Sequence, residues 1–132
     1  MSKHHSRFRT AVHALAVIAY VPERQATSER IASSVATDAT VVRKLLSMLR
    51  EHGLVRAVEG RGGGYALARP AESIGLGEVF AAVSEDALFP MPERSPNPDC
   101  PIGGNIHAAL DAPLEDATDA LLRQLDTTTL AE

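Results

Sequence analysis

The sequence has 132 residues, room for one domain plus an extra element, and its 45% hydrophobic content excludes wholesale disorder. No apolar run approaches the roughly 18 residues that span a membrane and no signal-peptide pattern opens the chain, so we expect a cytoplasmic protein. The net charge of −4 conceals two halves of opposite sign, because residues 1–70 carry eleven Lys and Arg against five acids and residues 71–132 carry two Arg against twelve acids.

Two helices are predicted at the start of the basic half. Apolar side chains recur at helical spacing through residues 6–20, and Pro22 ends this segment. Thr27 or Ser28 then caps a short second helix, whose two large apolar residues lie one turn apart.

A longer helix is predicted next. Thr37 or Asp38 is its candidate N-cap, and Gly53 ends it at the position where a left-handed residue costs least. The apolar residues between them share one helical face and are Val42, Leu45, Leu46 and Leu49. A short helix, a brief connection and a longer helix is helix-turn-helix spacing, although many helical cores that bind no DNA share it.

A β-hairpin with a glycine-rich tip is predicted after this helix. Its strands are Leu54 to Val58 and Tyr65 to Leu67, and its tip is GRGGG with Arg61 at the apex. The glycines allow the tip to approach a phosphate backbone or a minor groove closely. A nucleotide-binding loop would need a helix or a Lys-Ser/Thr pair after the glycines, and neither follows. Helix and hairpin together have the outline of a recognition helix and its wing.

The composition changes after Pro70. Residues 73–83 predict a short helix that packs back on the domain, and five prolines make the following segment an irregular loop. A last helix is predicted from residue 105 to residue 125. Pro113 should either kink this helix or delay its start. About 21 residues of helix would be roughly 32 Å long, more than a small core covers. We expect a second copy of the chain to bury its apolar stripe, with packing on its own domain as the alternative.

A family resemblance rests on the segment HGLVRAVEGRGGGYALARP and on ESIGLGEVF shortly after it. These residues resemble the wing and following helix of the Rrf2 family of bacterial winged-helix transcription regulators. The resemblance implies a mainly α fold with a small β-hairpin wing. It implies a winged helix-turn-helix DNA-binding domain over 1–83, a proline-rich loop over 84–104, and a dimerisation helix and tail over 105–132. The implied protein is a homodimer that binds a palindromic operator in double-stranded DNA, usually as a repressor.

The resemblance also implies which residues contact DNA. The base-reading positions early in the family's recognition helix match Thr40, Arg43 and Lys44. Where the family's wing often has an arginine, this sequence has Glu59, so we expect Arg61 to replace it in the minor groove. Ser47 is expected to be a lesser contact on the same helix, and Arg7, Arg9 and Ser28 are expected to anchor the DNA backbone. The full expected DNA-binding set is Arg7, Arg9, Ser28, Thr40, Arg43, Lys44, Ser47 and Arg61.

The sequence departs from the cluster-binding members of the family in its cysteines. Those members place three cysteines in the loop before the long helix, whereas this loop has only Cys100, so we expect no iron–sulfur cluster and no metal site. The loop PNPDCPIGGNI resembles that of a cluster-less subgroup with a lone cysteine. Cys100 precedes a candidate helix N-terminus, which would lower its pKa and favour redox sensing, and a small buried hydrophobic residue is the alternative.

These patterns favour one of three classes of function. We predict a sequence-specific transcriptional regulator, which is a repressor responsive to redox stress through Cys100. The alternative is a winged helix that has lost DNA binding and pairs with another protein through its acidic half, which Glu59 would suit. An enzyme is not expected, because neither metalloprotease-type histidine spacing nor a GxSxG motif is present.

Overall fold

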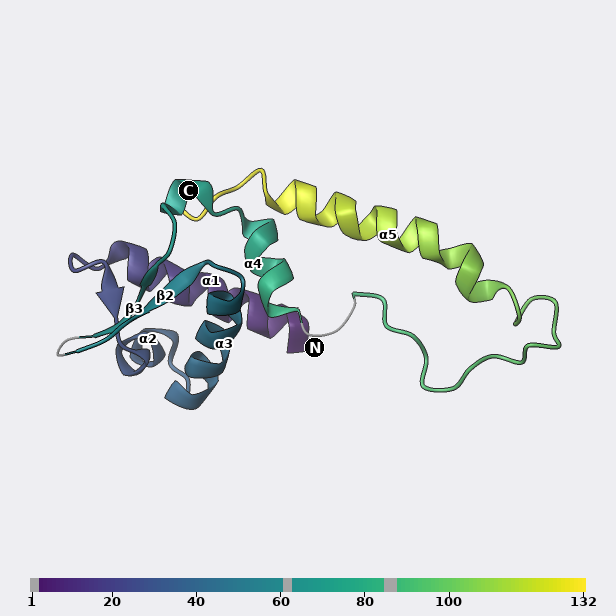
Figure 1. Ribbon diagram of the computed structural model, residues 1–132, viewed down its shortest axis with the longest axis horizontal. Coiled ribbons are helices and arrows are strands. Elements are labelled where there is room, and N and C mark those ends of the chain that lie inside the picture. Colours follow the sequence, from purple (N-terminus) through teal and green to yellow (C-terminus); the bar gives the residue numbers. More distant parts are fainter. Residues whose placement is uncertain (1–2, 61–62, 85–87) are drawn as a thin grey trace.

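The fold is known from a computed structural model that describes residues 3–60, 63–84 and 88–132. Figure 1 shows a compact domain from which one helix and a long loop extend. In chain order the elements are α1 (Lys3–Tyr20), β1 (Gln25–Ala26), α2 (Ser28–Val35), α3 (Ala39–Glu51), β2 (Val55–Val58), β3 (Gly64–Leu67), the 3-10 helix η1 (Ala71–Ser73), α4 (Leu76–Val83) and α5 (Ile106–Leu125). The predicted fold class, mainly helical with a small hairpin and a long last helix, is confirmed.

The core forms where α1, α2, α3 and α4 meet. Helix α1 begins at Lys3, before the predicted start at residue 6. The apolar stripe predicted for α3 points inward, whereas the buried face of α1 consists of Ala11, Ala14, Leu15 and Ile18, and Ala16 of its predicted stripe is exposed. Burying such faces is the main force that holds short helices in place. The largest fully buried side chains are Leu15, Ile18, Ile31, Leu46, Leu49, Leu54, Ile74, Val42, Val79 and Val83.

The helix-turn-helix connection is fixed by its caps. Of the two candidates at each helix start, Thr27 caps α2 and Asp38 caps α3. Each side chain accepts a hydrogen bond of 3.1 Å from a backbone N–H of its first turn. Ala36 adopts the left-handed conformation (φ 64°) that ends α2, so alanine serves at the position where a glycine is more common.

The sheet is antiparallel with strand order β1-β3-β2, and its outer strand β1 was not predicted. Ala26 of β1 pairs with Tyr65, which ties the start of α2 to the wing, the β2–β3 hairpin. Gly64 makes this approach possible, because its φ is 141° and a Cβ there would lie 2.3 Å from the carbonyl oxygen of Ala26.

A salt bridge joins the exit of the wing to α4. The Arg69 guanidinium donates to both carboxylate oxygens of Glu78, at 2.9 and 3.0 Å. Glu78 also accepts from the Gly75 N–H at 3.0 Å, and the bond from Arg69 holds the pKa of the Glu78 carboxyl below its usual range. Both side chains are more than a third exposed, so the pair orients α4 more than it stabilises the fold.

Helix α5 contacts the domain through its C-terminal end. A Cβ on Gly77 would lie 2.4 Å from the carbonyl oxygen of Leu122, so α4 and α5 approach each other closely there. The other end of α5 projects away from the domain beside the loop (Figure 1). Pro113 lies inside the helix, so the expectation that it might delay the helix start is wrong. None of the described helices is long and apolar enough to span a membrane.

Candidate nucleic-acid interface

Helix α3 divides into a buried face and an exposed one. Four of its apolar side chains are at most 2% exposed, and they are Val42, Leu45, Leu46 and Leu49. Thr40, Arg43, Lys44 and Ser47, all predicted to contact DNA, are exposed. The helix therefore presents polar and cationic side chains together on the side that faces away from the core.

Arg43 lies at the centre of a polar cluster between α2 and α3. Its Nη1 is 3.4 Å from the Ser28 Oγ and 3.4 Å from the Glu29 Oε2, and its Nη2 is 3.3 Å from the Thr40 Oγ1. The structure thus brings three predicted residues together, Ser28, Thr40 and Arg43. We call these three residues with Glu29 the α2–α3 cluster.

Glu29 belongs to this cluster although it was not singled out from the sequence. The only available signal was an acid in the first turn of a predicted helix, where the helix dipole favours negative charge. Its Oε2 accepts a hydrogen bond of 3.0 Å from the Ser28 hydroxyl. Ser28 itself is 6% exposed and is the sole buried polar residue among those described. Its hydroxyl is therefore enclosed between Glu29 and Arg43.

A hollow of about 360 Å³ separates the start of α2 from the wing. Residues 27–29 form one wall, and Gly60, Gly63 and Gly64 form much of the other. The N-terminus of a helix and a glycine-rich turn are both places where a phosphate can approach backbone N–H groups. Glu59 is exposed at the end of β2, and the predicted contact Arg61 lies outside the described residues.

Arg7 and Arg9 lie elsewhere. The Nη1 of Arg7 donates to the Val83 carbonyl at 3.1 Å, and the rings of Phe8 and Phe80 pack edge to face at 5.5 Å. These contacts hold the start of α1 against α4, whereas α2 and the wing lie toward the other end of α1 (Figure 1). The structure does not bring the two arginines to the α2–α3 cluster, and their role as DNA anchors stays a prediction.

Cys100 sits in a turn of its own rather than at the start of α5. Its N–H donates to the Asn97 carbonyl at 3.3 Å, and its carbonyl accepts from the Gly104 N–H at 2.8 Å. The backbone N–H groups of Gly103 and Ile102 hydrogen-bond to the sulfur and lower the pKa of the Cys100 thiol. The predicted lowering of this pKa thus has a different cause, because the helix itself begins at Ile106.

A search against protein families matches the Rrf2 model, described as an iron-dependent transcriptional regulator, over residues 4–132. The chain belongs to the Rrf2 family. Membership confirms the predictions of a DNA-binding transcriptional regulator and of a chain that is not an enzyme. YwnA of Bacillus subtilis, named as an HTH-type transcriptional regulator, is 35% identical over 128 residues, which cover 96% of this chain and 93% of YwnA.

Solved structures of the same shape agree with this assignment. A crystal structure described as that of a DNA-binding protein has a TM-score of 0.73 and 30% identity, covering 95% of this chain and 96% of that one. CymR, the global cysteine regulator of Bacillus subtilis, has a TM-score of 0.65 and 23% identity, covering 99% of this chain and 92% of CymR. The likeness to CymR is one of fold alone.

The iron in the family's description does not match the donor set of this Rrf2 chain. Cys100 is the single cysteine of the sequence. Within the part of the chain that the structure describes, no three His, Cys, Asp or Glu side chains are grouped so that they could hold a metal ion. One thiolate per chain falls short of the four ligands that an iron–sulfur cluster takes.

Proposed function

We propose that this Rrf2 chain is a homodimeric repressor that reads a palindromic operator with α3 and releases it when Cys100 is oxidised. The observation that carries the proposal is the convergence of Arg43, Thr40 and Ser28 at the exposed side of α3, next to the glycine-lined hollow of the wing. In this arrangement Arg43 and Lys44 reach base edges in the major groove, and the wing approaches the neighbouring backbone.

DNA binding of this kind is tested by selection from a library of random 30-base-pair duplexes. We expect an enriched palindrome whose half-sites lie about one helical turn apart, roughly 34 Å, since a symmetric dimer presents two copies of α3. Affinity for the enriched duplex should fall steeply with salt, because Lys and Arg displace counterions from phosphates. A winged helix that only binds proteins would enrich no sequence.

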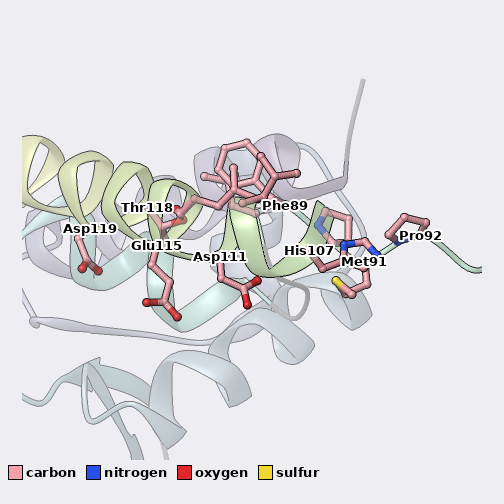
Figure 2. Close-up of a pocket in the computed structure, with 12 residues that line it drawn as sticks. Phe89, Met91, Pro92, His107, Asp111, Glu115, Thr118 and Asp119 are labelled. Atoms are coloured by element: carbon pink, nitrogen blue, oxygen red, sulfur yellow. The ribbon is translucent and has the colours of Figure 1, made fainter. Parts of the chain in front are cut away.

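The support for a dimer comes from α5. All of α5 is described, and none of its residues is buried. Ile106 and Leu110 are 37% and 42% exposed, and Phe89 of the preceding loop is 46% exposed. A hollow of about 580 Å³ lies between residues 88–92 and α5, and Figure 2 shows Asp111 and its acidic neighbours in a row along one edge of the helix. A second copy of α5 would remove the apolar side chains from water.

Replacing Leu110 by aspartate is expected to give a monomer, because a carboxylate cannot be buried in an apolar interface without a partner. Sedimentation equilibrium would show the mass halved, and operator affinity would fall because one half-site is left unoccupied. The control is Ala108→Asp, a neighbouring exposed position on the opposite side of the helix. A Leu110→Asp variant that remains dimeric at micromolar concentration would contradict this use of α5.

We further propose that the regulator senses oxidants without an iron–sulfur cluster, through Cys100 alone. A thiol with a lowered pKa is more often a thiolate, the form that attacks peroxides. The thiolate sulfur bonds to one peroxide oxygen, the O–O bond breaks and hydroxide leaves. The sulfur thereby loses two electrons to the peroxide and becomes a sulfenic acid.

The Cys100→Ser variant is expected to bind operator as tightly as the wild type but to stay bound when peroxide or diamide is added. The physical reason is that serine keeps the size of the side chain and lacks an oxidisable sulfur. Gel shifts with and without oxidant measure the release of operator DNA by the two proteins. A transcription assay on a template that carries the operator tests whether the bound protein represses and whether oxidant relieves the repression. Equal release by both proteins would show that Cys100 is not the sensor.

A further inference from the structure

We infer that Glu29 determines DNA specificity by acting on Arg43: it orients the guanidinium toward bases and keeps it away from phosphates. The inference rests on the proposed function, because it assigns a role within a recognition surface formed by α3. It adds a residue from α2 to that surface, one which is itself no expected DNA contact.

The geometry supports a positioning role. The acceptors around Arg43 come from two helices, with the Ser28 Oγ and the Glu29 Oε2 near Nη1 and the Thr40 Oγ1 near Nη2. Because a guanidinium is planar, acceptors near both terminal nitrogens favour one orientation of the group. Glu29 is in turn held by the 3.0 Å bond from the buried Ser28 hydroxyl. Contacts of 3.3–3.4 Å are long, so DNA can exchange them without a large penalty.

The charge of Glu29 supports discrimination against phosphates. An arginine on an exposed helix face, left alone, binds the nearest phosphate, and such contacts carry no sequence information. The side chains of Arg43 and Glu29 are 49% and 69% exposed, so both remain accessible to DNA. A carboxylate beside the guanidinium repels a phosphate but can tolerate the neutral edge of a base. Arg43 therefore gains more binding free energy from contact with a base than from contact with a phosphate of the DNA backbone.

The position of Glu29 in the hollow strengthens this effect. Glu29 lines the space between α2 and the wing, where the α2 N-terminus would otherwise attract a phosphate. Its carboxylate opposes that attraction, and Glu59 adds a second exposed carboxylate at the end of β2. The two carboxylates thus lower the sequence-independent affinity for DNA at the hollow, where the DNA backbone would come closest to the protein.

The test compares Glu29→Gln with the matched control Glu51→Gln. Glu51 is exposed at the last residue of α3, so its replacement removes the same charge without reaching Arg43. For each protein we measure affinity for the duplex that wild type enriches from the random library and for a scrambled duplex of the same composition. Glu29→Gln should bind the scrambled duplex about tenfold tighter and the enriched duplex nearly unchanged, with a salt slope steeper by about one. Glu51→Gln should shift both affinities equally.

The Arg43→Ala background shows whether Glu29 acts through Arg43. There, Glu29→Gln should leave the ratio of the two affinities unchanged, and a changed ratio would mean that Glu29 reads DNA by itself and overturn the inference. Equal ratios in Glu29→Gln and Glu51→Gln would overturn it as well. A wild-type protein that enriches no sequence would instead refute the proposed function, which separates the two failures.

Discussion

Replacing Arg43 and Lys44 together by alanine is expected to weaken operator binding by about 2 kcal/mol or more, since each base contact contributes about 1–3 kcal/mol. This corresponds to a roughly thirtyfold or greater rise in the dissociation constant. Both residues lie on the exposed face of α3, so their removal leaves the core intact. Discrimination between the enriched and the scrambled duplex should fall along with affinity, because base contacts specify whereas phosphate contacts only position.

Fluorescence anisotropy on both duplexes provides the measurement, and circular dichroism confirms that the helices are retained. The control is Arg123→Ala, which removes a cation from the last turn of α5. It should change both affinities slightly and equally. Full affinity and unchanged discrimination in the double variant would remove α3 from the role of recognition helix.

Replacing Leu46 by alanine is expected to lower the free energy of unfolding by about 2–5 kcal/mol, the usual range for a leucine truncated in a packed core. Leu46 is 0% exposed on the face of α3 that packs toward α1 and α4. The variant loses the transfer free energy of its methyl groups and also leaves a cavity that the surrounding helices fill only in part. Such a loss is a large share of the stability of a small domain.

Urea unfolding followed by circular dichroism measures this loss, with an unchanged m-value showing that the same surface is exposed. The matched control is Val41→Ala, on the same helix but 46% exposed, which should change stability by less than about 0.5 kcal/mol. Equal effects at the two positions would mean that α3 does not pack as described.

The elements that were predicted well are those whose signal is local. Apolar spacing placed the buried face of α3, and the glycines placed the hairpin, because each signal lies within one element. Strand β1 was not predicted, because a strand of two residues is too short to show an alternation of apolar and polar side chains. Its existence depends on Gly64 allowing the wing to approach Ala26, which is a tertiary contact.

The candidate site was predicted only in part for the same reason. The exposed residues of α3 follow from helical periodicity, whereas the approach of Glu29 to Arg43 depends on how α2 crosses α3. Fourteen residues separate the two in sequence, and no spacing rule links them. The N–H groups that surround the Cys100 sulfur likewise depend on a turn whose backbone path the sequence does not reveal.

Backbone hydrogen bonds hold the junction between α4 and the end of α5. The Leu76 N–H donates to the Thr128 carbonyl at 3.0 Å, and the Leu130 N–H donates to the Ile74 carbonyl at 2.8 Å. These hydrogen bonds attach the residues just beyond α5 to the start of α4, which packs on α1 and α3. In the proposed dimer, a displacement of α5 would therefore be carried to α4 and to the helices on which α4 packs. The distance between the two α3 helices of that dimer would then depend on the α4–α5 junction, which lies apart from the residues proposed to contact DNA.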